Sequence, residues 1–282
     1  MEKYSVLMSV YVKENPQYLR ESIESMLNQT VKCDQFVIVE DGRLTTDLEK
    51  VIDEYNNSYR GLFTIIKYEK NLGLGKALNI GLNYCKNDLI ARMDSDDISI
   101  KHRCERQLEE FVKEPKMAIC SSNILEFTGD INNVTSMRRV PEHQEEIKRR
   151  MRTRSAFNHP AVMLRKSEVI RCGGYGTIIR KEDHDLFSRM MNNGCIAYNI
   201  QEPLLYYRVD NGNLKRRTDW INCKGYIEVQ WNIYKRRECD LMDLLFVVSS
   251  QLFFYLAPKQ IVGFITRKML RERYAIASED QK

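Results

Sequence analysis

Short apolar runs alternate with segments of helical periodicity along the first third of the chain. The apolar runs are rich in β-branched residues and lie at 5–10, 36–39, 63–68 and 89–93. Apolar positions recur at helical spacing after Pro16, and further helices are predicted at about 46–55 and 75–85. Strands that alternate with helices in this way predict an α/β fold, with a Rossmann-like, doubly wound, mostly parallel sheet flanked by helices.

The middle of the chain has a less regular pattern. It predicts a strand at 119–127, a charged helix at 142–151, a short apolar segment at 161–164, a glycine-rich loop at 173–176 and a helix at 181–192. Acidic residues fill the first turn of this last helix, where the helix dipole favours them.

The composition changes after residue 223, so we expect one unit at 1–223 and a helical C-terminal extension at 224–282. The extension has an apolar stretch at 244–257, which is shorter than the roughly twenty residues needed to span a bilayer. A second stretch, at 261–273, mixes apolar and basic residues. This composition suits both helices packed on the core and helices lying on an anionic membrane surface, so both interpretations stay open.

The acidic residues directly after the run at 89–93 are the strongest chemical signal. Asp94, Asp96 and Asp97 lie within four residues, and carboxylates so close together repel one another unless a cation binds between them. In an extended segment Asp94 and Asp96 share a face, whereas Asp97 points away. Hard cations such as Mg²⁺ and Mn²⁺ bind oxygen ligands of this kind together with substrate phosphates. The same residues also suit a structural turn or a helix cap, and the cluster alone leaves both interpretations open.

The overall composition limits the other classes of function. A net charge of +5, with 43% hydrophobic and 29% charged residues, is ordinary for a globular protein, and no nucleic-acid partner is expected. The eight cysteines form no Cys-x-x-Cys pair and have no zinc-ligand spacing with histidine, which favours reduced thiols. A strand pattern begins within the first few residues without a recognisable signal peptide, so we expect a cytoplasmic protein.

Several short motifs follow one another in a fixed order along residues 4–210. They are Ser9-Val10-Tyr11, Ser25-Met26-Leu27-Asn28-Gln29-Thr30, Val39-Glu40-Asp41-Gly42, Asn71-Leu72-Gly73-Leu74-Gly75-Lys76-Ala77-Leu78-Asn79, Ala91-Arg92-Met93-Asp94-Ser95-Asp96-Asp97, His159-Pro160-Ala161-Val162-Met163, Gly173-Gly174-Tyr175, Glu182-Asp183-His184-Asp185-Leu186 and Leu204-Leu205-Tyr206-Tyr207-Arg208. Each motif alone is weak, whereas their order and spacing are specific. Together they resemble a bacterial family-two glycosyltransferase, an inverting enzyme of the GT-A fold.

The resemblance implies a metal and nucleotide site after the fourth strand. Asp94 and Asp96 would form the metal motif, with Asp96 on the metal, Asp94 on the metal or the ribose, and Asp97 as a substitute ligand. The cation would be Mg²⁺ or Mn²⁺ and would neutralise the departing diphosphate. Asp41 would accept a hydrogen bond from the uracil ring.

Further substrate contacts are implied at four other positions. Ser9 and Tyr11 would form the wall of the donor pocket, although Tyr11 also suits a plain core position. Lys76 and Arg208 would contact the nucleotide or a phosphate, although Lys76 also suits a solvated helix face. A phosphate-binding loop around Lys76 is rejected, because position 70 is not glycine and alanine follows the lysine.

The resemblance assigns acceptor chemistry to the helix at 181–192. Asp183 would be the catalytic base that takes the proton from the attacking hydroxyl. Glu182 would bind the acceptor sugar or cap the helix. His184 is expected to be a supporting or surface residue, because nothing pairs it with a nucleophile.

The resemblance thus implies a metal-dependent hexosyltransferase that uses a UDP-sugar donor, with glucose or galactose as the sugar. The implied acceptor is a lipid-diphosphate-linked saccharide in surface polysaccharide biosynthesis, at the inner face of the cytoplasmic membrane. Two alternatives stay open. One is a nucleotidyltransferase of similar fold, and the other is a noncatalytic nucleotide-sugar-binding scaffold at the membrane.

Overall fold

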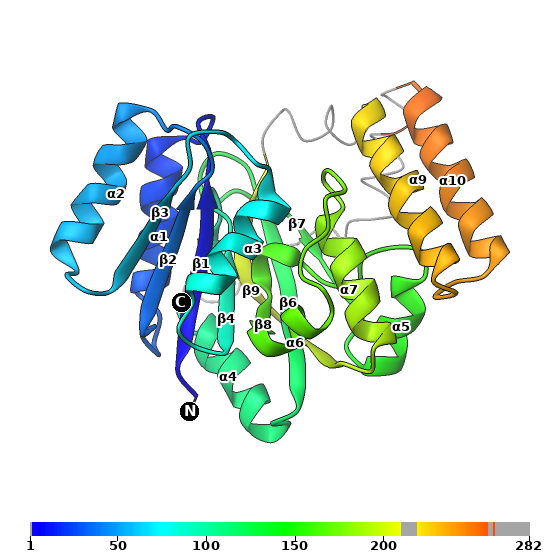
Figure 1. Cartoon of the computed structure of the whole chain (residues 1–282), viewed down its shortest axis with the longest axis horizontal. Helices are drawn as coiled ribbons and strands as arrows, with labels where there is room; N and C mark the ends of the chain where they lie inside the picture. The colour runs from blue at the N-terminus through cyan, green and yellow to red at the C-terminus, as the bar shows by residue number, and fades with distance from the viewer. Residues whose placement is uncertain (1, 210–218, 259–261, 263–282) are drawn as a thin grey trace, which may run out of the picture.

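One mixed sheet runs through the structure, a computed structural model that describes residues 2–209, 219–258 and 262 (Figure 1). Within these residues the sheet has nine strands in the spatial order β3-β2-β1-β4-β8-β6-β9-β5, and β7 pairs with β6. The strands are Tyr4–Val10 (β1), Gln35–Glu40 (β2), Phe63–Lys67 (β3), Leu89–Met93 (β4), Ile98–Ser99 (β5), Met117–Phe127 (β6), Val134–Arg138 (β7), Met163–Arg165 (β8) and Ile196–Arg208 (β9).

The first four strands of this order form a parallel half-sheet. β1 pairs in parallel with β2 and β4, and β2 pairs in parallel with β3. β8 is antiparallel to both of its neighbours, β4 and β6, whereas β6 and β9 are again parallel. The short strand β5 and the outer strand β7 are antiparallel to their partners. The predicted mostly parallel sheet of the GT-A fold is confirmed.

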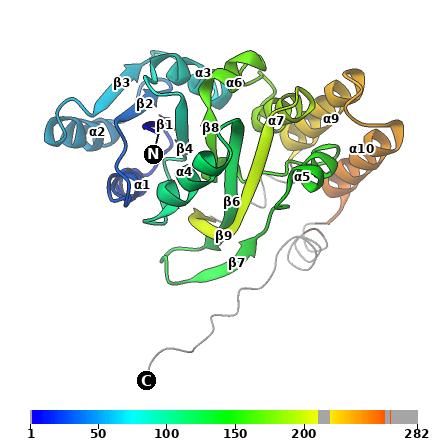
Figure 2. The same ribbon diagram turned by 90° about the horizontal axis from the view of Figure 1, so that it is seen from below.

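Helices cover both faces of the sheet (Figure 2). Alternate strand residues point to opposite faces, so Val6 and Met8 join the core under α1, α2 and α4, whereas Leu7 joins the core under α3, α5, α6 and α7. The helices are Pro16–Leu27 (α1), Thr46–Ser58 (α2), Leu74–Tyr84 (α3), Arg103–Lys113 (α4), Gln144–Met151 (α5), Lys166–Arg171 (α6) and Glu182–Asn192 (α7), with a short 3₁₀ turn at His159–Ala161.

Capping explains where the predicted helices begin. The Asn15 side chain accepts a hydrogen bond from the backbone N–H of Gln17 at 2.8 Å, and Pro16 occupies the first helical position of α1, where no N–H partner is needed. Thr45 caps α2 in the same way, by accepting from the N–H of Leu48.

Helix α4 is not evident from the sequence pattern, because two of its core positions are polar. Arg103 and Gln107 are fully buried. Arg103 donates to the carbonyl oxygens of Arg92 and Val162, and Gln107 donates to those of Cys120 and Ala161. These bonds satisfy side chains that a search for apolar periodicity treats as solvent-facing.

A helical hairpin, α9 (Trp220–Lys235) and α10 (Leu241–Leu256), packs beside α7 at the edge of the molecule (Figure 1). The expected boundary between residues 223 and 224 falls inside α9. The basic stretch predicted at 261–273 lies outside the described residues, apart from Val262. Among the helices that the structure describes, none has the length and apolarity needed to cross a membrane.

Candidate active site

The carboxyl ends of β1, β2 and β4 meet at one edge of the sheet. β1 lies between β2 and β4 and is parallel to both, so the segments that follow the three strands leave the sheet side by side. These segments carry Tyr11, Asp41 and Asp94. Ser9 is half-buried near the end of β1, and Tyr11 is 40% exposed, so Tyr11 is not a core residue.

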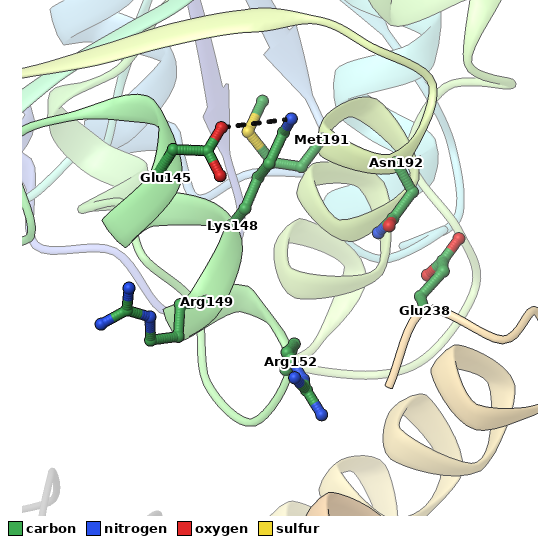
Figure 3. Close-up of a pocket in the computed structure, with 7 residues that line it drawn as sticks. All are labelled: Glu145, Lys148, Arg149, Arg152, Met191, Asn192 and Glu238. Carbon is green, nitrogen blue, oxygen red and sulfur yellow. Dashed lines mark ion pairs between the residues drawn. The ribbon is translucent and has the colours of Figure 1, made fainter. Parts of the chain in front are cut away.

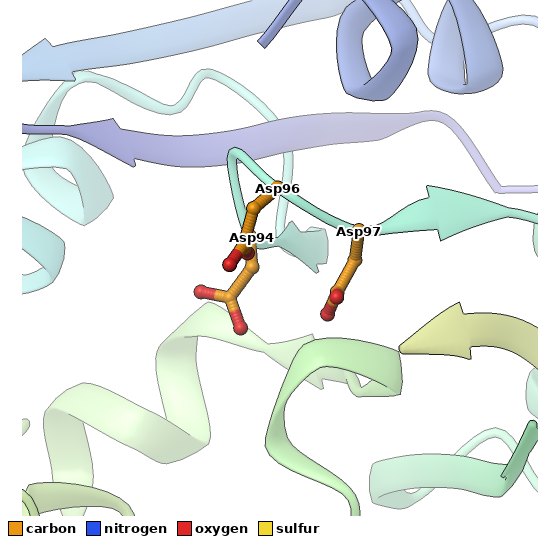
Figure 4. Close-up of side chains that lie close together, drawn as sticks. All are labelled: Asp94, Asp96 and Asp97. Atoms are coloured by element: carbon orange, nitrogen blue, oxygen red, sulfur yellow. The ribbon is translucent and has the colours of Figure 1, made fainter. Parts of the chain in front are cut away.

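The acidic turn, Asp94–Asp97, brings its three carboxylates together. One carboxylate oxygen from each of Asp94, Asp96 and Asp97 lies within 4.8 Å of the others (Figure 4). The expectation that Asp97 points away is therefore wrong. The chain turns after Asp94 instead of continuing as a strand, so the alternation of an extended segment does not apply.

Asp97 is fully buried in this turn. Its Oδ1 accepts a hydrogen bond from the N–H of Arg208 at 2.9 Å. Its Oδ2 has no hydrogen-bond partner among the described residues. A buried carboxylate oxygen without a donor is costly, and a cation or a proton is the partner that would satisfy it.

The electrostatics of the acidic turn point the same way. Burial and the neighbouring Asp94 and Glu14 raise the pKa of Asp96 to about 7. Burial and the adjacent Asp96 raise the pKa of Asp97 well above its usual value. Crowded carboxylates with raised pKa values suit a hard divalent cation such as Mg²⁺ or Mn²⁺. Without a metal, bound protons reduce the repulsion between the carboxylates, and a bound cation would reduce it in their place.

Arg92 supplies a fixed positive charge behind the turn. It lies on β4, is 2% exposed, and donates from Nη1 and Nη2 to the two carboxylate oxygens of Asp94. Its charge also acts on Glu182, at the start of α7. Arg92 thus links the acidic turn electrostatically to a second group of carboxylates. Its sequence signal is an arginine inside an otherwise apolar strand.

Asp41 holds the loop that leads into α3. Its two carboxylate oxygens accept from the backbone N–H groups of Leu72 and Gly73 at 2.6 and 3.0 Å. The Asn71 side chain also donates to the carbonyl oxygen of Asp41 at 3.1 Å. Gly42 is required beside it, because its φ is +92° and a Cβ there would lie 2.9 Å from the Asn71 nitrogen.

The first turn of α3 lies against the start of α7. A Cβ at Gly75 would lie 2.6 Å from the carbonyl oxygen of Gly176 and 3.2 Å from the Cβ of Glu182. Only glycine allows this approach. Lys76 follows directly and is exposed, so its side chain is available to a ligand at this junction.

Glu182 and Asp183 have different electrostatic surroundings. Burial and the adjacent Asp183 raise the pKa of the Glu182 carboxyl to about 7. Burial also raises the pKa of Asp183, but the charge of Lys181 and the backbone N–H of His184 lower it, and the net shift is downward. Near neutral pH Asp183 is therefore ionised, whereas Glu182 is partly protonated. Neighbouring acids with separated pKa values are typical of acid–base sites.

His159 and Tyr175 form a buried pair next to these acids. The Tyr175 hydroxyl lies 3.0 Å from Nε2 of His159. Burial and the charge of Arg92 lower the pKa of His159 to about 3, so the imidazole is neutral at neutral pH. The Asn79 side chain fixes this pair by bonding both the N–H and the carbonyl oxygen of Tyr175 at 2.8 Å. The sequence motifs contain Asn79, His159 and Tyr175, but they do not show that these residues are in contact.

Arg208 supports the acidic turn from the end of β9. Its Nε donates to the carbonyl oxygen of Asp96 at 2.8 Å, and its Nη2 donates to Oε2 of Glu21 at 2.6 Å. The guanidinium also stacks 3.8 Å from the centre of the Tyr18 ring. These contacts make Arg208 a positioning residue, and its predicted phosphate contact stays a prediction.

His184 is a buried structural residue. It is 1% exposed, and its Nε2 lies 3.2 Å from the carbonyl oxygen of Met151. The alternative of a surface position is therefore wrong, whereas the expectation of a supporting role agrees with its surroundings.

A polar pocket of about 290 Å³ lies elsewhere, where α5 and α7 meet the loop of the helical hairpin (Figure 3). Lys148 there pairs with Glu145 at 3.7 Å, and Arg152 pairs with Asp240 and Asp243. It shares no residue with the acidic turn, and it is lined by Glu145, Lys148, Arg149, Arg152, Met191, Asn192 and Glu238.

Comparison with known proteins decides the family. The family model described as glycosyl transferase family 2 matches residues 5–174, which include the acidic turn and His159. The chain belongs to glycosyl transferase family 2.

Two proteins named as glycosyltransferases match the chain almost end to end. An Escherichia coli protein named UDP-Gal:alpha-D-GlcNAc-diphosphoundecaprenol beta-1,3-galactosyltransferase is 36% identical over 271 residues, covering 95% of this chain and 97% of its own. The amylovoran biosynthesis glycosyltransferase AmsE of Erwinia amylovora is 34% identical over 270 residues, covering 94% and 98%.

Solved structures support the family fold at low sequence identity. The chain resembles the S. aureus TarS 1–349 structure in complex with UDP-GlcNAc, with a TM-score of 0.64, 18% identity and coverage of 95% of this chain and 76% of that one. It also resembles the Pyrobaculum calidifontis mannosyltransferase PcManGT in complex with GDP-Man and Mn²⁺, with a TM-score of 0.63, 13% identity and coverage of 91% and 70%.

Proposed function

We propose that this family 2 member transfers a hexose from a UDP-sugar to a hydroxyl of a lipid-diphosphate-linked saccharide, with inversion at the anomeric carbon. The hexose is galactose or glucose, and the product enters a bacterial surface polysaccharide such as O-antigen, capsule or exopolysaccharide. The names of the E. coli and Erwinia relatives, which match nearly the whole chain, support this substrate class. The nucleotidyltransferase and scaffold alternatives gain no support from these relatives.

The observation that carries the proposal is the division of carboxylates into two groups. The acidic turn follows β4, and Glu182 and Asp183 open α7 on a separate part of the chain. Arg92 acts electrostatically on both groups, since Asp94 and Glu182 both feel its charge. A glycosyl transfer with inversion needs one group for the leaving diphosphate and another for the attacking hydroxyl.

In the proposed reaction Asp183 is the catalytic base. Its carboxylate takes the proton of the acceptor hydroxyl while that oxygen bonds to the anomeric carbon. The bond from the anomeric carbon to the diphosphate oxygen breaks at the same time, and UDP leaves on the opposite face. Glu182, whose pKa is about 7, hydrogen-bonds the acceptor sugar beside the base.

Asp96 and Asp94, with Asp97 beside them, are the proposed ligands of a Mg²⁺ or Mn²⁺ ion. When bound, this ion supplies the positive charge that stabilises the leaving diphosphate. Asp41, Ser9 and Tyr11 are the proposed uridine contacts, because they lie where the neighbouring strands β1 and β2 end.

We further propose that residues 1–223 form the catalytic unit and that residues 224–282 form a C-terminal extension. Lipid-linked acceptors keep the enzyme at the cytoplasmic membrane, so its proposed place is peripheral, on the inner face. Lys76 lies exposed at the start of α3 and is the proposed cationic contact of the donor diphosphate.

The test is a donor panel with purified protein. UDP-galactose, UDP-glucose and UDP-GlcNAc are incubated with Mn²⁺ or Mg²⁺ and a short-chain lipid-diphosphate GlcNAc acceptor. The expected result is release of UDP together with a disaccharide whose anomeric proton coupling indicates inversion. Release of pyrophosphate in a parallel reaction with UTP and a sugar 1-phosphate would indicate a nucleotidyltransferase, and UDP-sugar binding without turnover of any donor would indicate a scaffold. Either outcome overturns the proposal.

A further inference from the structure

Helix α10 exposes apolar residues along one side, with Ser249 as a polar position between Phe246 and Phe253. The apolar residues recur at helical spacing and are between 50% and 76% exposed. We call these residues the outer stripe: Met242, Leu245, Phe246, Phe253 and Leu256. An α-helix rises 1.5 Å per residue, so the 16 residues of α10 extend for about 24 Å. Exposed apolar residues gathered on one side of a helix are typical of an interaction site.

The opposite side of α10 is packed. Leu244 and Val247 are buried, and the helix contacts α9 along the hairpin. Asp240 and Asp243 form a capping box that fixes the start of α10. The outer stripe is therefore a separate surface, not the unfilled half of the hairpin core.

The sequence of the C-terminal extension and the aromatic contacts of the hairpin suit a lipid bilayer. Residues 244–258 contain no charged side chain, and the sequence at 259–273 then has five basic residues and one acidic residue. Trp220 contacts Tyr255 with ring centroids 5.4 Å apart, and Trp231 lies 5.8 Å from the Lys235 ammonium. Aromatic rings with a polar end, together with basic residues, prefer the headgroup region of anionic membranes.

The hairpin is tied to the helix that carries the proposed base. Arg236, at the end of α9, bonds Asp185 of α7 at 2.9 Å. Glu238, in the hairpin loop, accepts from Ser188 of α7 at 2.8 Å. Arg152, after α5, donates to Asp243 at 2.7 Å. A surface bound at α10 is therefore held at a fixed position relative to α7.

We infer that the outer stripe of α10 docks on an anionic lipid bilayer and thereby holds α7 at the level of the lipid-linked acceptor. This inference rests on the proposed function for its substrate, but the docking itself does not depend on catalysis. The helix lies in the interface with its apolar face inserted, because about 24 Å is shorter than the hydrocarbon core, which is about 30 Å thick.

The test compares the full-length protein with the double variant Phe246→Ser/Phe253→Ser. Sedimentation with vesicles of phosphatidylglycerol and phosphatidylethanolamine gives the affinity for the bilayer. We expect the double variant to bind at least about tenfold more weakly, because each phenylalanine loses a substantial area of buried apolar surface. The matched control is Val112→Ser/Ile170→Ser, which removes side chains 58% and 55% exposed on α4 and α6 and should bind vesicles as the parent does.

Two further readouts separate the possible outcomes. Transfer to a short-chain, water-soluble acceptor should be equal in the double variant and the parent, whereas transfer to a long-chain acceptor in vesicles should fall. A protein without any transferase activity but with the same loss of vesicle binding would overturn the proposed function and leave the docking surface in place. Unchanged vesicle binding would overturn the inference. So would a parent dimer that the double variant converts to a monomer, because the occupant of the stripe would then be a second copy.

Discussion

Arg92 holds both carboxylate oxygens of Asp94, two residues further along the chain, in a forked ion pair. The Arg92 side chain is 2% exposed, whereas that of Asp94 is 28% exposed. The pair thus places a permanent cation on the inner side of the acidic turn and leaves the outer side to a ligand. Among the described ion pairs, none places a cation as close to Asp96 or Asp97 as Arg92 is to Asp94. A divalent ion is therefore needed beside Asp96 and Asp97.

Removal of the Arg92 charge should destabilise the protein strongly. In Arg92→Met the carboxylate of Asp94 loses its partner inside the acidic turn, and breaking a buried pair in this way typically costs about 3–5 kcal/mol. Urea denaturation measures the free energy of unfolding. Arg92→Lys keeps the charge but not the fork, so a smaller loss is expected.

The matched control for this prediction is Arg20→Met. Arg20 also forms a forked pair, with Glu54, but at the surface. Exposed pairs contribute about 0–1 kcal/mol, so Arg20→Met should have little effect. Equal losses in Arg92→Met and Arg20→Met would contradict the assigned role of Arg92.

Asp183→Asn should remove the base without disturbing the donor site. The amide has the same shape as the carboxyl but cannot accept the acceptor proton, and general-base catalysis typically contributes about 10²–10⁴ in rate. We expect kcat to fall by this order while the affinity for UDP, measured by calorimetry, stays within about twofold. Asp53→Asn, an exposed change on α2, is the control. An Asp183→Asn enzyme with parental kcat would remove Asp183 from the mechanism.

Metal binding should depend on pH through Asp96 and Asp97. Burial and neighbouring carboxylates raise the pKa of Asp96 to about 7 and that of Asp97 well above normal, whereas an unfolded aspartate titrates near about 4. Between these values the folded, metal-free protein binds more protons than the unfolded chain, so its stability falls as the pH rises. A bound cation replaces those protons.

Added Mn²⁺ should therefore raise Tm more at pH 8 than at pH 5.5, as scanning calorimetry would show. The variant Asp96→Asn/Asp97→Asn should lose most of this difference, because the two carboxyls of the acidic turn whose pKa values are raised are then absent. An equal Mn²⁺ effect at both pH values would mean that these carboxylates do not hold the ion.

The sequence predicts most of the parallel half-sheet, because its strands are apolar and each is followed by a clear turn or cap. Leu89–Met93 is predicted with its observed bounds. Helix α4 is hidden because Arg103 and Gln107 are polar but fully buried, and their hydrogen bonds appear only in three dimensions. Strand β9 is not evident from the sequence, because the buried and exposed positions along its 13 residues do not alternate with a period of two.

For the candidate site, the sequence indicates which motifs carry chemistry but not how they support one another. The orientation of Asp97 is mispredicted because a one-residue change from strand to turn reverses the face of a side chain. The hydrogen bonds between Asn79 and Tyr175 join residues 96 positions apart, and no local spacing in the sequence predicts such a contact. Arg92 belongs to a quoted motif, yet its partner is visible only when the turn is closed.

Arg208 and Lys76 differ in their expected roles near the donor site: Arg208 supports the acidic turn, whereas Lys76 is free to contact the nucleotide. Its guanidinium bonds Glu21 and the carbonyl oxygen of Asp96, and its backbone N–H bonds Asp97. Lys76, in contrast, is exposed at the start of α3. Arg208→Met should therefore weaken Mn²⁺ binding by about tenfold or more, because the acidic turn loses its support, while metal-free UDP binding stays close to parental. Lys76→Met should weaken metal-free UDP binding and leave Mn²⁺ binding close to parental. Calorimetric titration of each variant with Mn²⁺ and with UDP distinguishes the two roles, and weaker metal-free UDP binding in Arg208→Met would return Arg208 to the phosphate-binding role that the motif implies.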